Sequence, residues 1–174
     1  MRIRSLLSPA AVLLAAIVAM PAHADGKPVQ LALFNPVQVF PEKESISGLR
    51  IDLIYGVNQN VQGLDWGLVN HVKGNGFAWQ VGGVGYVEKD FTGWQDNYVN
   101  VTRGKCTGFQ SGIYNDADEG DGVMLGILNH TKSMHGLQLG LLNMTETLHG
   151  LQIGVGNFVQ KGKMVFLPIV NWSH

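Results

Sequence analysis

Cysteine, basic clusters and long apolar runs are all scarce in this 174-residue sequence. Its one cysteine, Cys106, has no second thiol to pair with, so packing and hydrogen bonds must hold the fold without an internal disulfide. The absence of a basic cluster disfavours a nucleic-acid partner. After residue 24 the sequence has no apolar run of about 18 residues, so no transmembrane helix is predicted there. Patterns typical of helices are absent as well.

Residues 1–24 have the pattern of a secretory signal peptide. Arg2 and Arg4 give a basic start, residues 6–20 are predominantly apolar, and residues 22–24 (Ala-His-Ala) form a small-x-small cleavage site. We therefore expect an exported protein that begins near Asp25 and resides in the periplasm, in the outer membrane or at the cell surface. Without the two arginines, 10 of the 12 basic residues remain against 13 acidic ones, a net charge of −3.

Glycine is abundant, and its positions reveal a tandem repeat. All 23 glycines lie after residue 24. The motif is clearest in residues 136–143, Gly-Leu-Gln-Leu-Gly-Leu-Leu-Asn, which recur in a near copy at 150–157. Copies begin 15 residues apart in the first half and 14 apart in the second, at Gly48, Gly63, Ala78, Gly93, Gly108, Gly122, Gly136, Gly150 and Met164. A fixed short period is typical of repeat architectures.

Each copy has the same order of residue types when its first residue is counted as position 0. Position 1 is apolar, position 2 is most often glutamine, and position 4 is most often glycine. Tyr55 and Gly85 interrupt an otherwise regular position 7, which is asparagine at Asn70, Asn100, Asn115, Asn129, Asn143, Asn157 and Asn171. Because the pattern alternates with period two, each copy should form strands and not helices.

The repeat predicts an all-β fold, a β-solenoid of 14–15-residue coils in which equal positions of successive coils stack. Asparagine would then lie over asparagine and glutamine over glutamine, with side-chain amides hydrogen-bonded along each column. We expect Leu137, Leu139 and Leu141 to fill the interior, and most tryptophans to pack internally or at coil ends. The alternative is an antiparallel β-meander or an up-and-down β-barrel, in which each unit is one long strand and one turn.

Two parts are expected after the signal peptide. Residues 25–47 should form N-terminal capping strands and a connector, and residues 48–174 the repeat domain with a C-terminal cap. Pro36, Pro41 and Pro168 lie near the two ends, where proline removes the N–H that a further strand would need. Both ends should therefore resist edge-to-edge growth into a fibre.

The sequence resembles a family of bacterial exported "surface repeat" proteins in three features that occur in the same order. They are the lead-in at residues 48–56, the repeat Gly-Leu-Gln-x-Gly-Leu-x-Asn, and the closing segment Leu-Pro-Ile-Val-Asn-Trp at 167–172. The resemblance covers nearly all of the chain after the signal peptide. It implies an exported repeat protein of unassigned biochemistry, so no catalytic residue is carried over. The sequence departs from the pattern at 78–85 and at Asp96-Asn97, where irregular coils are expected.

No constellation of catalytic residues is visible, so the protein is predicted not to be an enzyme and to need no cofactor. The acidic segment 115–121 offers a candidate calcium site through Asp116, Asp118 and Asp121. Its spacing fails the EF-hand pattern, and a solvated turn is the simpler interpretation. No other metal site is predicted.

A binding face is a hypothesis for the middle coils. Trp66 and Asp96, both at position 3, interrupt the regular pattern in the coils from Gly63 to Asn100. Together with Trp94 they are the candidate binding residues. His135 and His149 share one position of the repeat, so their rings should stack about 4.8 Å apart on the surface of adjacent coils.

The sequence thus predicts a non-enzymatic exported repeat protein with a structural, adhesive or envelope-interaction role. An envelope or host-surface component is the expected kind of partner. One alternative is an outer-membrane β-barrel or pore-like protein, which would associate with a membrane. Another is a small-ligand or calcium-binding β-repeat module.

Overall fold

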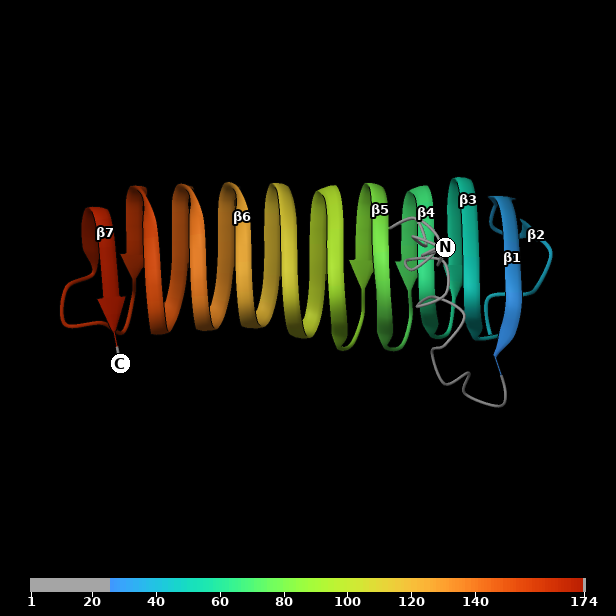
Figure 1. The fold of residues 1–174 in the computed structure, drawn as a ribbon, viewed down its shortest axis with the longest axis horizontal. Coiled ribbons are helices and arrows are strands. Elements are labelled where there is room, and N and C mark those ends of the chain that lie inside the picture. Colours follow the sequence, from blue (N-terminus) through green and yellow to red (C-terminus); the bar gives the residue numbers. More distant parts are fainter. Residues whose placement is uncertain (1–25, 174) are drawn as a thin grey trace, which may run out of the picture.

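The computed structural model describes residues 26–173, and within that range the chain is all strand, turn and loop. The strands are β1 (Lys27–Phe34), β2 (Val37–Gln38), β3 (Ile46–Asn58), β4 (Val61–Val72), β5 (Gly76–Val87), β6 (Phe91–Val159) and β7 (Phe166–Ser173). Figure 1 shows them wound as one continuous spring, with β6 running through several coils. The predicted β-solenoid is confirmed. The predicted signal peptide lies outside the described residues.

Successive coils run in the same direction and in register. Strands β3, β4, β5 and the start of β6 pair in parallel, so that Gly48 lies beside Gly63, Gly63 beside Ala78, and Ala78 beside Gly93. Both antiparallel alternatives are therefore wrong for the repeat. Within the described range, no helix has the length and hydrophobicity needed to cross a membrane.

The glycine at position 0 is required by stacking and by backbone conformation together. Gly136 has a φ of +129°, a region that residues with a Cβ rarely adopt. A Cβ added there would also collide with the carbonyl oxygen of Gly122, directly beneath it in the stack. The same two constraints apply to Gly63, Gly93, Gly108, Gly122 and Gly150.

The side of the repeat strand that faces the interior is the opposite of the one predicted. Gln138 and Asn143 are fully buried, whereas Leu141 is 54% exposed and Leu137 and Leu139 are half-buried on the outer surface. The prediction that these leucines fill the interior is wrong. The inner side of the strand needs glycine at position 4, because a Cβ at Gly140 would meet the amides of the flanking asparagines. Leucine therefore takes the outward-facing positions.

Buried amides satisfy one another along two columns. In the asparagine column, Asn115 donates to Asn129, Asn129 to Asn143 and Asn143 to Asn157, each at 2.8 Å. Each of the three donor amides also donates to a backbone carbonyl of the next coil. In the glutamine column, Gln152 donates to Gln138 at 2.8 Å. The stacked-amide prediction is confirmed, and it explains how so many polar groups can be buried.

The opposite wall supplies the apolar part of the core. Its inward side chains lie at position 9 and two residues before each position 0. They form one buried cluster with a few neighbours, and its members are Val61, Val72, Ala78, Val87, Phe91, Cys106, Ala117, Met124, Met134, Leu148 and Val159.

The two ends depart from the repeat. At the N-terminal end β1 pairs in parallel with β3, and the short β2 pairs antiparallel with β1. At the C-terminal end the chain reverses after Val159, and β7 pairs antiparallel with the end of β6. Asn171 consequently lies beside Gln152 and not beside Asn157, so its predicted place in the asparagine ladder is wrong.

Candidate functional site

One wall of the solenoid carries an exposed apolar surface along its whole length. We call this surface the apolar face; it consists of the side chains at positions 1, 3 and 5 of each copy from Gly48 to Gly150, with the paired outward residues of β1 and β7. None of these side chains is buried, and Val155 is 68% exposed. Exposed residues of the face include Leu31, Leu33, Leu53, Trp66, Leu68, Trp79, Trp94, Tyr98, Ile113, Leu125, Ile127, Leu141, Ile153, Val155 and Trp172. A continuous apolar patch of this size is unusual on a monomer and is typical of interaction sites.

Aromatic side chains from adjacent coils contact one another in the first half of the apolar face. Trp79 and Trp94 lie on adjacent coils with ring centroids 5.5 Å apart and planes 17° apart, and Phe109 meets Trp94 edge-on. Trp66 is exposed on the coil before Trp79. The expectation that most tryptophans pack internally or at coil ends is wrong, because Trp66, Trp79 and Trp94 are exposed on the apolar face, as is Trp172.

The three candidate binding residues lie on this one face. Asp96 is two strands from Trp66 at the same repeat position, and it follows Trp94 by two residues. Ser111 donates to the Asp96 carboxylate at 2.6 Å, and the Trp94 indole N–H donates to Ser111 at 3.3 Å. Asp96 is the single charged side chain of the apolar face. It is bonded to its neighbours and does not project alone.

The opposite wall is charged, with signs that alternate along one column. Position 10 of successive copies holds Lys73, Glu88, Arg103, Asp118, Lys132 and Glu146. Lys132 pairs with Asp118 at 2.9 Å, and Lys161 with Glu146 at 2.6 Å. Sequence reasoning missed this ladder, although the strict alternation of sign at one position was a readable signal. The molecule therefore has one apolar wall and one charged wall.

Each carboxylate of the candidate calcium site already has a cationic partner. Asp116 accepts from Arg103 at 2.8 Å and contacts His130 at 2.8 Å. Asp118 pairs with Lys132. Asp121 pairs with Lys105 at 2.7 Å, and that hydrogen bond lowers the pKa of Asp121. No group of three or more acidic, histidine or cysteine side chains that could hold a metal occurs in residues 26–173.

The first coils bury an ionic group that the sequence analysis did not identify. Arg50 donates to both oxygens of Asp65 at 2.7 Å, and its Nε lies 3.2 Å from Asp52. All three side chains are fully buried, and neither oxygen of Asp52 accepts a hydrogen bond. Burial raises the pKa of Asp52 to about 7 in spite of the nearby guanidinium. The charged exceptions in the glutamine column, Arg50 and Asp65, were the available signal.

The remaining reactive side chains are positioned for packing. His135 and His149 stack with centroids 4.7 Å apart and planes 3° apart, close to the expected spacing. His71 is held between Tyr55 and Glu88. Cys106 is buried, and burial raises the pKa of its thiol to about 12, which opposes formation of a nucleophilic thiolate.

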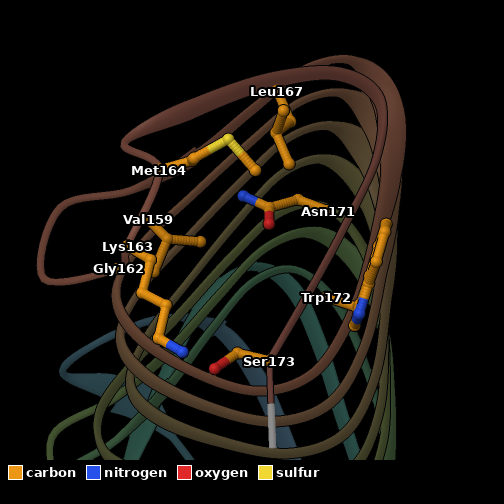
Figure 2. Close-up of a pocket in the computed structure, with 8 residues that line it drawn as sticks. All are labelled: Val159, Gly162, Lys163, Met164, Leu167, Asn171, Trp172 and Ser173. Carbon is orange, nitrogen blue, oxygen red and sulfur yellow. The ribbon is translucent and has the colours of Figure 1, made fainter.

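A pocket lies at the C-terminal end of the stack, where β7 covers the last coil (Figure 2). Val159, Met164, Leu167 and Asn171 contribute to its lining, and Asn171 reaches into the space enclosed by the coil. The lining contains no acidic, histidine or cysteine side chain, and Lys163 is its one ionisable side chain. The apolar face is the stronger candidate for function.

Comparison with protein-family models found no match, and comparisons with curated proteins and with solved structures found no significant match either.

Proposed function

We propose that the protein is a non-enzymatic, exported repeat protein that works by contact through its apolar face, in a structural, adhesive or envelope-interaction role. The observation that carries the proposal is the face itself. It joins exposed leucines, isoleucines, valines and tryptophans into one surface along the stack. Apolar area of that extent favours association with another surface, since burial contributes roughly 25 cal/mol for each Å² removed from water.

The arrangement of polar groups supports the same proposal. The buried amides bond to one another, the acidic side chains of segment 115–121 pair with cations, and Cys106 lies inside the core. These groups build the framework and do not gather around a cleft. The signal-like residues 1–24 and the resemblance to exported surface repeat proteins give the proposed location.

Cell fractionation of a tagged full-length chain tests this function. We expect the unmodified protein in the envelope fraction. Leu141→Asp and Ile127→Asp each put a charge on the apolar face and should lower the envelope-bound fraction by about tenfold or more. Gln160→Asp makes the same charge change at an exposed position on the charged wall and should leave the fraction unchanged. Unaltered retention of both face variants would contradict the proposal.

A further inference from the structure

We propose that the apolar face is covered by a second copy of this chain, with the two solenoids packed face to face and their long axes reversed. This inference rests on the proposed function, because it names the partner at the same face. Four observations carry it: the area of the face, the chemistry of its edges, the distribution of large and small side chains along it, and a strained residue at one end.

The face has the area that a stable dimer needs. About ten strand segments at about 4.8 Å spacing, and about 17 Å of strand across them, give about 800 Å². A typical stable protein–protein interface buries about 800 Å² on each partner. Two flat sheets can approach to about 10 Å and interdigitate their apolar side chains, as sandwich folds do. A second copy is the one partner whose surface is certain to match in length.

The edges of the face disfavour a lipid surface as the partner. Binding to anionic lipid uses lysine and arginine around an apolar patch. Neither edge carries such a residue between 47 and 157, since one edge is Ser47, Gln62, Phe77, Thr92, Thr107, Asp121, His135 and His149, and the other is apolar or glycine. Lys73 and Lys132 lie on the charged wall, and the amine of Lys105 is paired with Asp121 at the edge. Asp96 lies near the middle of the face, where contact with hydrocarbon would be costly.

Large side chains gather in the first half of the apolar face and smaller ones in the second half. The first half of one copy can therefore pack on the second half of another copy whose long axis is reversed. The aromatic ridge of Trp66, Trp79 and Trp94 lies in the first half. A shallow apolar groove lies in the second half and is lined by Leu125, Leu139 and Leu141 with their neighbours. A two-fold axis in the plane of the interface, along the strands between Asp96 and Ser111, brings Trp66 of each copy over Leu139 in the groove of the other copy. The same axis places Trp79 opposite Val123 and Trp94 opposite Phe109.

The alternative face-to-face pairing, with parallel long axes, is less favourable. It would place Asp96 opposite Asp96 of the other copy and set ridge against ridge. Like charges at such close range are destabilising, and bulky side chains opposed across two flat sheets leave voids on both sides. The reversed pairing avoids the opposition of the ridges and places Asp96 opposite Ser111 of the other copy, about 4.8 Å along the stack from the other Asp96.

The C-terminal end of the face holds a strained residue. Ile169 has a φ of +70°, which is rare for a β-branched side chain, and it is 71% exposed beside the groove. Strain of this kind clusters at functional sites. In the reversed pairing, the start of the other copy covers this end of the face.

Sedimentation equilibrium of the purified protein tests the dimer. We expect a dimer at micromolar concentration, since interfaces of this size bind at micromolar affinity or tighter. Leu141→Asp and Ile127→Asp should raise the dimer dissociation constant at least about 100-fold, and Gln160→Asp should not change it. Circular dichroism shows whether each variant keeps its strands. If an aspartate variant unfolds, Leu141→Ser and Ile127→Ser replace it.

Orientation is tested by a spin label at His149→Cys, on the edge of the face. The two labels should lie about 34 Å apart in the reversed pairing and near 20 Å in the parallel one. A protein that stays monomeric at about 100 μM overturns the dimer, as does a dimer that the face variants leave intact. A monomer that binds phosphatidylglycerol vesicles through the face also overturns it. If that monomer's face variants still lose envelope retention, the proposed function stands while the dimer fails.

Discussion

The two halves of the solenoid share one framework but fill the space behind the apolar face differently. From Asn100 to Asn157, one asparagine per coil forms an unbroken ladder, with glycine at position 4 of the coils from Gly108 onward. In the first half the same column runs Gly56, Asn70, Gly85, Asn100, so alternate members lack a side chain. Gly56 takes this place, and not Tyr55 as the spacing suggested, because the register shifts between Asp52 and Tyr55.

In the first half, side chains at position 4 fill the space that Gly56 and Gly85 leave empty in the asparagine column. Asp52 and Asn97 occupy position 4, where other coils have glycine, and each lies against one of the column glycines. A Cβ at Gly56 would meet the Asp52 carboxylate, and a Cβ at Gly85 would meet the Asn97 amide. Interior volume is therefore kept nearly constant by exchange between two columns. The repeat therefore keeps the interior packing constant while the residue types at the two columns change.

The largest effect on stability is expected at position 0, where every copy from Gly48 to Gly150 begins with glycine except the one that begins with Ala78. Gly136→Ala should destabilise the fold by about 4 kcal/mol or more, because it adds backbone strain to a collision with the Gly122 carbonyl. Ala78 fills the same position in the first half without a positive φ. Ala78→Gly is thus the matched control, with an expected change within about 1 kcal/mol. Urea unfolding of both variants measures the difference, and equal losses would show that the column is not under steric constraint.

The exchange between columns predicts a compensating pair. Gly85→Asn alone should cost about 2 kcal/mol through collision with Gln80 and Asn97. Asn97→Gly alone should cost about 1 to 3 kcal/mol, because it removes the donor at 2.7 Å to Asn100. Together they restore the pattern of the second half, so the double variant should be within about 1 kcal/mol of the unmodified protein. A double-mutant cycle by urea unfolding checks this, and additive losses would refute the exchange.

Sequence reasoning reached the stacking of coils because period is a global property of the chain. The amide ladder followed from stacking, since equal positions at about 4.8 Å spacing must interact. The assignment of inside and outside failed, because alternation identifies two faces without saying which is buried. Hydrophobicity favoured Leu141 for the interior, but steric exclusion at Gly140 decided the opposite. The reversal that displaces Asn171 was hidden because the last copy keeps the asparagine of position 7 while β7 runs backwards.

The candidate site could be predicted only in part. Trp66, Trp94 and Asp96 were named as binding candidates because Trp66 and Asp96 are irregular at position 3, and the structure brings all three to one face. The extent of that face could not be predicted once its leucines were assigned to the core. The calcium candidates were chosen by charge alone, and their lysine, arginine and histidine partners come from neighbouring coils 13 to 16 residues away along the chain.

The smallest expected effect concerns the buried ionic group, which only the first half contains. In the unfolded chain Asp52 ionises near its ordinary pKa of 3.8, whereas in the fold its pKa is about 7. Between these values the unfolded chain has released the proton and the fold still holds it. The stability contributed by Asp52 is therefore complete below about pH 4 and is lost as the pH rises toward 7.

Asp52→Asn keeps the shape of the protonated side chain and removes the titration. The variant should gain about 1 to 2 kcal/mol over the unmodified protein at pH 7.5 and little at pH 4, because Arg50 keeps both hydrogen bonds to Asp65. Urea unfolding at half-unit pH steps measures the difference, and subtracting the two curves removes the contribution of the exposed acids that both proteins share. Asn129→Asp in the second half is the matched control. It buries a carboxylate with no arginine beside it, so its stability should fall more steeply over the same pH range. A difference curve that is flat from pH 4 to 7 would show that Asp52 is ionised in the fold, with Arg50 compensating its burial in full.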